Sequence, residues 1–288
     1  MPQAPVIFDR HLLRARHRRA AALGPVTFLV DRVADELSER LAAVLRPFDL
    51  AADLGTPSDA VRRAIEAKVG RIVDVVADEE ALPFRDASLD LVVSALALQF
   101  VNDLPGTLVQ VRRALKPDGL LLAAMIGGDS LNELRESFAA AESEIEGGVS
   151  PRVAPFADLR DLGALLQRAG LALPVTDVDR LTVRYDSPLG LMHDLRRMGA
   201  TNALTARRRT PLRRATLKRM LEIYAERFAD GDGRVRATFE IVWLSGWAPD
   251  ASQQQPLKPG SATTRLADAL GTQEIRTGEK AGGRDDVN

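Results

Sequence analysis

The sequence contains no cysteine, and this absence excludes disulfide bonds, thiolate metal sites and a cysteine nucleophile. Its formal net charge of −1 gives no bulk electrostatic reason to bind nucleic acid or a membrane surface. No apolar run is long enough to span a bilayer, and the N-terminal stretch lacks the apolar core of a secretory signal. We therefore expect a cytoplasmic protein with no metal site, no nucleic-acid partner and no membrane span.

The composition is typical of a globular protein, with hydrophobic residues making up 45% of the 288. This length is enough for one large domain or two small ones. The Arg-rich N-terminal stretch predicts an amphipathic helix, and a second helix is predicted over Phe28–Leu45 before Pro47 ends it. His11 and His17 lie in the first of these without a metal-ligand partner, so both are expected on the surface.

A βαβ unit is the clearest local pattern. Leu89–Ser94 is a short apolar run typical of a strand, and Leu120–Ile126 is a second such run. Between them, apolar residues at helical spacing predict a helix over Leu104–Leu115, which the turn residues Lys116–Gly119 end. Because a helix joins the two strands, they should lie parallel and adjacent with a right-handed crossover.

Three stretches of this unit carry a resemblance to a known family: ADEEALPF, SLDLVVSALALQFVNDLP and ALKPDGLLL. They resemble the second half of a class I S-adenosylmethionine (SAM) dependent methyltransferase domain. Within that superfamily they are similar to the malonyl-acyl-carrier-protein methyltransferase branch and, in that branch, to the mitochondrial complex I assembly factor 5 group and its bacterial relatives. The resemblance continues through MIGGDSLNELRESFAAAESEIEGGVSPRVAPF and past Trp247, so it covers most of the chain.

The resemblance implies a Rossmann-like α/β fold with a mostly parallel central sheet and an antiparallel edge. It implies SAM-dependent methyl transfer to a small-molecule or protein acceptor. One alternative is a respiratory complex I assembly factor that modifies a subunit, as an arginine hydroxylase does. The other is a binding or assembly protein that keeps the fold without catalysis. The partner is then a substrate, an acidic carrier protein or a complex I subunit.

The predicted cofactor loop departs from the family pattern Asp-x-Gly-x-Gly-x-Gly. It reads Asp53-Leu-Gly55-Thr-Pro57-Ser-Asp59, so only the first glycine is present. Pro57 removes a backbone donor, and Asp59 places a negative charge where a carboxylate would bind. Alternatively, Ser58 or Asp59 simply caps a helix over Ala60–Lys68. We expect SAM to bind weakly or not at all.

The sequence is also short after this loop, because only Val69–Ala77 precede Asp78. A single strand, Arg71–Val76, must serve where the family has two, so the sheet should be shortened on that side. If this strand takes the second position, Asp74 is the acid that grips the ribose. If it takes the third position, which the ADEEALPF motif favours, Asp74 is only an edge residue.

The resemblance nominates six cofactor-binding residues and no catalytic residue. They are Asp53, Gly55, Asp78, Glu79, Ala95 and Gln99. Asp78 would meet the adenine amino group. Gln99 stands where relatives often carry His, and because an amide cannot accept a proton at neutral pH, acid–base catalysis there should be weak.

The remaining sequence predicts how the site is covered. Ser130 and Glu133 form a capping-box pattern at the start of a helix over Leu131–Glu146. Leu171–Tyr185 alternates as an antiparallel edge strand or pair does. The basic segment Ala206–Arg219 is either a solvated face or a surface for an acidic or phosphate-bearing partner. We divide the chain into N-terminal helices (1–48), an α/β domain (49–249) with a helical insertion at about 131–202, and a flexible tail (250–288).

Overall fold

The computed structural model describes residues 5–75, 79–254, 261 and 264–273. Its chain divides into two units, a larger one up to Ala251 and a smaller one from Ser252 onward. The strands are β1 (Phe48–Leu54), β2 (Val69–Val75), β3 (Leu89–Ala95), β4 (Leu115–Ile126), β5 (Ala172–Tyr185) and β6 (Val235–Trp247). The helices are α1 (Arg10–Ala22), α2 (Phe28–Ala42), α3 (Ala60–Ile65), η1 (Leu98–Phe100), α4 (Leu104–Ala114), α5 (Asn132–Glu146), α6 (Leu159–Arg168), α7 (Pro188–Arg197), α8 (Arg214–Phe228) and α9 (Leu266–Leu270).

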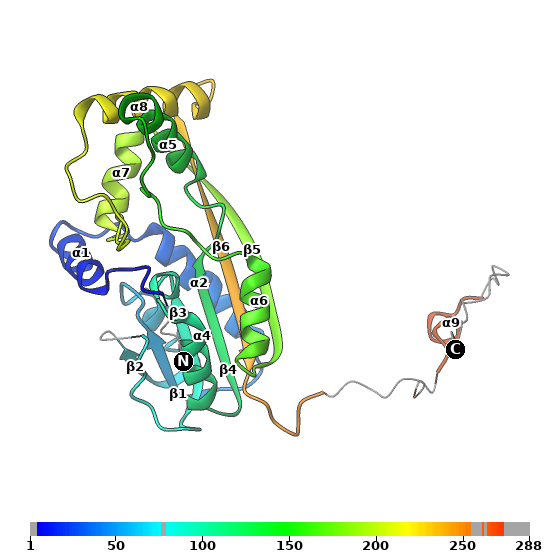
Figure 1. Ribbon diagram of the computed structural model, residues 1–288. Coiled ribbons are helices and arrows are strands. Elements are labelled where there is room, and N and C mark those ends of the chain that lie inside the picture. Colours follow the sequence, from blue (N-terminus) through cyan, green and yellow to red (C-terminus); the bar gives the residue numbers. More distant parts are fainter. Residues whose placement is uncertain (1–4, 76–78, 255–260, 262–263, 274–288) are drawn as a thin grey trace, which may run out of the picture. The chain divides into compact units, whose positions relative to one another are not determined.

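The strands of the larger unit form one mixed sheet in the order β2-β1-β3-β4-β6-β5 (Figure 1). The four strands β2, β1, β3 and β4 are parallel, and β4 lies next to β3 as the βαβ pattern predicted. The connecting helix α4 begins where the Asp103 side chain accepts a hydrogen bond from Gly106 N at 2.9 Å. The Rossmann-like fold class and the βαβ unit are thus confirmed.

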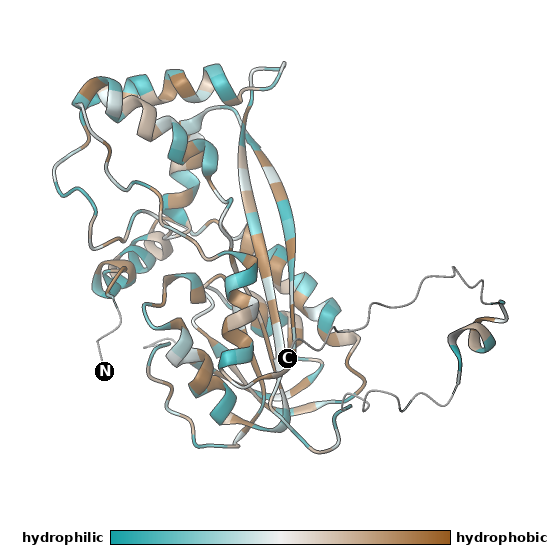
Figure 2. Cartoon of the chain, turned by 45° about the vertical axis from the view of Figure 1, so that its right-hand side comes forward, coloured by the Kyte–Doolittle hydropathy of each residue, from teal (hydrophilic) through white to brown (hydrophobic). Residues whose placement is uncertain are grey.

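The other end of the sheet is antiparallel. β6 pairs antiparallel with both β4 and β5, which confirms the predicted antiparallel edge over Leu171–Tyr185. Bands of hydrophobic and hydrophilic residues alternate along this long strand pair (Figure 2), as period-two strands require. The helices α5, α7 and α8 gather at one end of the pair (Figure 1). The stretch 131–202 therefore contributes a strand of the central sheet as well as helices.

The shortened side of the sheet consists of β2 alone. β2 is an edge strand, as expected, and it pairs directly with β1, with Asp53 opposite Asp74. It therefore takes the second position in the sheet, and the interpretation that favoured the third position is wrong. The connection through α3 is short, so the strand that follows it pairs with β1, the strand before it. The ADEEALPF motif follows β2 in the sequence and does not determine this pairing.

An apolar layer covers each face of the sheet. On one face, the stripe Leu29, Val33, Leu37 and Leu41 of α2 is buried against the central strands. On the other face, α4 and α6 supply the layer. Leu45 was expected to extend the α2 stripe, but α2 ends at Ala42 and Leu45 is 99% exposed. These layers hold the carboxyl ends of the parallel strands in place.

The predicted capping box of α5 is not formed. Leu131 holds the N-cap position with a φ of 56° and makes no side-chain cap bond. Instead, Ser130 Oγ accepts a hydrogen bond from Glu240 N at 2.9 Å, and the buried Glu133 carboxylate accepts from Thr238 N at 3.1 Å. Glu133 thus binds Thr238 of β6, 105 residues further along the chain, instead of capping its own helix. These hydrogen bonds attach α5 to β6.

The smaller unit begins at Ser252, and within it the structure describes the short helix α9. The prediction of a flexible tail over 250–288 falls largely on residues outside those described. Within the described ranges, no helix is both long and apolar enough to cross a membrane.

Candidate functional site

Two adjoining hollows lie near the carboxyl ends of the parallel strands, where ligands bind in open α/β sheets. The polar pocket has a volume of about 240 Å³ and is lined by the loop after β1 and the end of β2. The apolar cavity has a volume of about 360 Å³ and lies under α1, α2, α5 and α7. Pro57 lines both, so the two hollows meet at the residue that replaces the second glycine of the loop.

Asp53 lies at the base of the polar pocket, at the carboxyl end of β1. The residue is 4% exposed, and its carboxylate accepts a hydrogen bond from Thr56 Oγ1 at 2.5 Å. Thr56 Oγ1 in turn accepts a hydrogen bond from Ala95 N at 3.0 Å. Thr56, which the resemblance did not nominate, therefore links Asp53 and Ala95, which it did. Burial, and secondarily the negative charge of Asp74, raise the pKa of Asp53 to about 7. Asp53 can therefore exchange a proton near neutral pH.

Asp74 lies opposite Asp53, at the end of β2, and lines the same pocket. Its carboxylate pairs with Arg62 of α3 at 2.5 Å. The sequence had offered Asp74 as the ribose acid only under the interpretation that the structure supports. A carboxylate at the end of the second strand is suited to accept hydrogen bonds from sugar hydroxyls.

Gly55 and Glu79 are brought into direct contact. Gly55 has a φ of 70°, and a Cβ on it would clash with Glu79 Oε1, so no other residue fits there without displacement. Glu79 pairs with Arg10 of α1, whose Nη1 donates to Phe100 O at 3.1 Å. Arg10 was not nominated from the sequence.

At the start of α3, the charge of Asp59 is less able to repel a bound carboxylate than the sequence predicted. Asp59 occupies the N-cap position without a side-chain cap bond, whereas Ser58 Oγ accepts a hydrogen bond from Ala60 N at 3.2 Å. The Asp59 carboxylate is 64% exposed and pairs with Arg63 at 2.5 Å. It is therefore neither desolvated nor unpaired, and its repulsion of a bound carboxylate is weaker than the sequence suggested.

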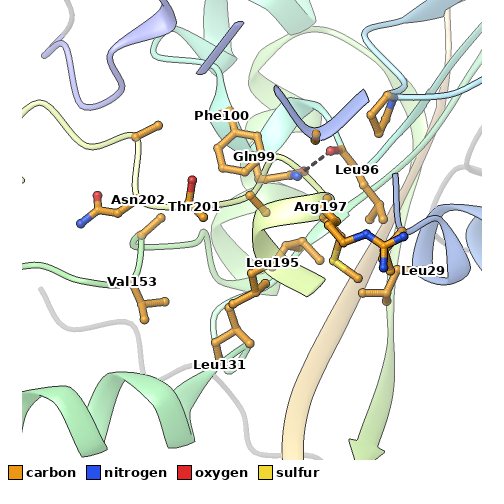
Figure 3. A pocket seen from close by; sticks show the side chains of 18 of the residues that line it. Leu29, Leu96, Gln99, Phe100, Leu131, Val153, Leu195, Arg197, Thr201 and Asn202 are labelled. Carbon is orange, nitrogen blue, oxygen red and sulfur yellow. Dashed lines mark hydrogen bonds between the residues drawn. The ribbon is translucent and has the colours of Figure 1, made fainter. Parts of the chain in front are cut away.

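Gln99 was expected at the rim of a pocket and instead lies in the wall of the apolar cavity (Figure 3). The residue is 7% exposed, and its Nε2 donates to Leu96 O at 2.6 Å. Its Oε1 is buried and has no hydrogen-bond partner among the described residues. Such an orphaned acceptor inside an apolar wall is unfavourable unless a ligand donates to it.

His17 of α1 is another polar side chain in the wall of the apolar cavity. It was expected on the surface, but it lines the cavity and is half-buried against Gly199, on which a Cβ would clash with His17 Cδ2. Burial, and secondarily the charge of Arg10, lower the pKa of His17, so the imidazole is neutral at physiological pH. His11, in contrast, is exposed as expected. Helical spacing alone did not reveal which face of α1 is covered by the end of α7.

The rim of the cavity also contains a buried charge pair. Arg152 lines the cavity and pairs with Glu142 of α5, whose side chain is 1% exposed. Ser150 N also donates to the Glu142 carboxylate at 2.7 Å. Although burial alone would raise it, hydrogen bonds from Ser150 and Arg152 hold the pKa of Glu142 below its usual value. The pair fixes the 150–153 loop over the cavity.

Asp78 lies outside the described residues, so its predicted contact with adenine stays a prediction. In the part of the chain that the structure describes, no group of three or more His, Asp or Glu side chains is arranged to hold a metal ion. The structure thus gathers Asp53, Gly55, Glu79 and Ala95 around one loop, and it places Gln99 in the adjoining cavity.

Comparison with known proteins identifies the family. Residues 49–123 match the family model of a methyltransferase domain. The chain is 37% identical to the mitochondrial arginine-hydroxylase NDUFAF5 of Mus musculus over 97% of this chain and 88% of that protein. It is 39% identical to a malonyl-[acyl-carrier protein] O-methyltransferase of Gallionella capsiferriformans over 62% of this chain and 59% of that protein.

A solved structure shows the same fold. A Bacillus halodurans protein assigned as a methyltransferase has a TM-score of 0.50 and 17% identity, and the match covers 74% of this chain and 99% of that one. At that identity the match shows the fold alone, while the sequence relatives show the family. The chain belongs to the class I SAM-dependent methyltransferase superfamily, within the family of the NDUFAF5 arginine-hydroxylases.

Proposed function

We propose that the protein binds SAM, with low affinity, in the polar pocket and transfers its methyl group to an acceptor in the apolar cavity. The observation that carries this proposal is the position of Pro57, which lines both hollows. A two-substrate transfer needs adjoining sites of different chemistry, and the polar loop beside an apolar cavity provides them.

The residues present fit the nucleoside part of SAM. Asp74 offers a carboxylate to ribose hydroxyls, and Gly55 forms a cradle at φ 70° that a Cβ would fill. Glu79 packs against that cradle and pairs with Arg10, so it must shift for a ligand to approach the Gly55 backbone. This displacement and the donor missing at Pro57 are the reasons for expecting weak binding.

When bound, SAM supplies an electrophilic methyl group, and the chain supplies orientation. Gln99 Oε1 accepts a hydrogen bond from an N–H or O–H of the acceptor, which satisfies its missing partner. His17 is neutral and lines the same cavity, so it can take up a proton that the acceptor releases. The apolar walls exclude water from the transfer.

A titration of SAM and S-adenosylhomocysteine into the purified chain by calorimetry tests the proposal. We expect saturable binding to the unmodified chain and loss of binding in Gly55→Ala. Gly231→Ala is the matched control, because its Cβ would meet nothing within 4 Å. No heat of binding at millimolar ligand, or equal binding by Gly55→Ala and the unmodified chain, would contradict the proposed site.

A second candidate function is hydroxylation of an arginine side chain in a protein partner such as a complex I subunit, with dioxygen as the oxygen source and a two-electron reductant as co-substrate, so that the second oxygen atom leaves as water. Its support is the length of the match, since the NDUFAF5 relative aligns over 97% of this chain, including the α1 and α7 walls of the cavity, whereas the methyltransferase model covers residues 49–123. A guanidinium is also an N–H donor of the kind that Gln99 Oε1 lacks. Mass spectrometry of a candidate protein substrate distinguishes the two, because one reaction adds a methyl group and the other an oxygen atom.

A third possibility is a binding or assembly role without catalysis, which predicts a bound partner whose mass does not change. The cellular location is part of the proposal as well. We place the protein in the cytoplasm on its composition, whereas the NDUFAF5 relatives are named as mitochondrial.

A further inference from the structure

Two arginine-rich segments begin next to each other beside the apolar cavity, and we call this pair the arginine seam. Helix α1 has the sequence RHLLRARHRRAAA, and residues 206–213 have the sequence ARRRTPLR, with no acidic residue in either. The residues just before each segment pair with each other, since Phe8 forms a bridge with Leu204 and Asp9 N donates to Ala203 O at 2.8 Å. Two adjacent segments of one charge sign produce a focused positive potential.

Arg16 lies on α1, within the arginine seam. Its Nη1 is buried and has no hydrogen-bond partner among the described residues. Burial first, and then the charges of Arg207 and Arg19, lower the pKa of the Arg16 guanidinium. A buried guanidinium N–H without an acceptor is unfavourable, and a bound anion would satisfy it.

The nearby carboxylate is already engaged elsewhere. Asp9 accepts from Arg207 Nη2 at 3.2 Å and from Leu12 N at 2.9 Å. Arg207 also donates to Leu204 O at 2.8 Å, so its guanidinium is fixed in place beside α1. In the arginine seam, Arg207 is thus fixed by hydrogen bonds, whereas Arg16 Nη1 lacks an acceptor among the described residues. The Asp9 carboxylate both caps α1 and binds Arg207.

Sequence neighbours of Arg16 and Arg207 line the apolar cavity. His17, next to Arg16, and Ala20, one helical turn later, both line the cavity. Ala203 and Leu212, which flank Arg207 on its segment, line it too. A ligand that reaches Arg16 with a charged group can therefore place an attached apolar chain against these walls.

We propose that Arg16 and Arg207 form an oxyanion subsite at the rim of the apolar cavity, for a ligand that carries a phosphate or carboxylate group on an apolar chain. This names the substrate class of the acceptor cavity, and it rests on the proposed function only for the role of that cavity. The charge selects the ligand's head group, and the cavity selects its chain.

Calorimetry on the full chain with short amphiphiles below their critical micelle concentrations tests this subsite. Octyl phosphate, octanoate, octanol and inorganic phosphate separate the contributions of the phosphate, the carboxylate and the chain. We expect one or both octyl anions to bind at least about tenfold more tightly than octanol, and the stronger of them identifies the head group. Inorganic phosphate alone should bind weakly, because it cannot use the cavity.

Arg16→Gln and Arg207→Gln should each remove about tenfold of the anion's affinity and leave octanol binding unchanged. Arg214→Gln, an exposed cation of the neighbouring helix α8, is the matched control and should change nothing. Arg16→Lys, which keeps the charge but loses the planar fork, should give an intermediate loss and guards against a folding defect in Arg16→Gln.

Equal affinity of the octyl anions and octanol, or equal losses in Arg16→Gln and Arg214→Gln, would overturn the subsite. A SAM titration of the same proteins keeps the two proposals distinct. Anion binding without SAM binding contradicts the proposed transfer and leaves the subsite standing, whereas SAM binding without anion selectivity does the reverse.

Discussion

The polar pocket and the apolar cavity adjoin at Pro57, yet the pKa of a buried carboxyl group is raised in the pocket and lowered at the rim of the cavity. In the polar pocket, burial raises the pKa of Asp53 to about 7, so the charged form is disfavoured. At the rim of the cavity, Ser150 and Arg152 hold the pKa of Glu142 below its usual value even though that side chain is 1% exposed. The difference shows that the cavity rim is a structural element of the fold, while the polar pocket retains a destabilising charge of the kind that functional sites keep.

Removal of the Glu142 carboxylate should have the largest effect on this comparison. Glu142→Ala leaves the Arg152 guanidinium, 16% exposed, without its anion, and we expect a loss of about 3–5 kcal/mol in the free energy of unfolding by urea denaturation. Because the folded-state pKa is lowered, the stability from this group is present above its unfolded pKa and is lost as pH falls through the folded value.

The control for this change is Glu144→Ala, two residues away on α5. Glu144 pairs with Arg219 at 2.6 Å on an exposed face, so its loss should lower stability much less than the loss of Glu142. Equal effects of the two substitutions would show that the 150–153 loop is not fixed by Glu142.

Asp53→Asn should change stability in the opposite direction. Asn keeps an oxygen that can accept from Thr56 Oγ1 and removes the buried charge. One pKa unit is worth about 1.4 kcal/mol, so the gain above pH 7 should be about 2–4 kcal/mol. The folded pKa is raised from 3.8 to about 7, so the stability from the protonated carboxyl is full below about pH 4 and is lost as pH rises to 7.

Thermal unfolding of both proteins between acidic and mildly alkaline pH measures this gap. The two curves should meet at low pH and separate as pH rises. Asp86→Asn is the control, since the Asp86 side chain is 66% exposed, pairs with Arg113 and does not line the polar pocket, and it should give no comparable separation. A constant gap at every pH would show that Asp53 does not titrate in the folded protein.

Asp59→Asn should have the smallest effect. Because the Asp59 carboxylate is 64% exposed and paired with Arg63, we expect a change of less than about 0.5 kcal/mol in stability and less than about threefold in SAM affinity. Pro57→Gly, by contrast, restores a backbone N–H and should raise SAM affinity in the same titration. A larger gain from Asp59→Asn than from Pro57→Gly would restore the electrostatic argument first drawn from the sequence.

The polar pocket could be predicted from sequence far better than the cavity. Asp53, Gly55 and Glu79 lie in contiguous motifs at strand ends, so the family pattern located them directly. Gln99 was recognised, but its position in an apolar wall depends on helices α1 and α7, which contact each other across more than 160 residues of chain. Side-chain bonds such as Glu133 to Thr238 follow from tertiary packing, which overrides the local capping signal.

The bare β2 edge affects how the protein behaves in concentrated solution. Among the described residues, β2 ends the sheet, and the outer backbone groups of such an edge strand are a template for pairing with another chain. Arg71 and Asp74 are exposed along β2, and charges of both signs on a short edge strand oppose fibril-like stacking. The charge on Asp74 thus protects solubility as well as facing the pocket, and any redesign of the pocket that neutralises it should be checked for self-association by light scattering.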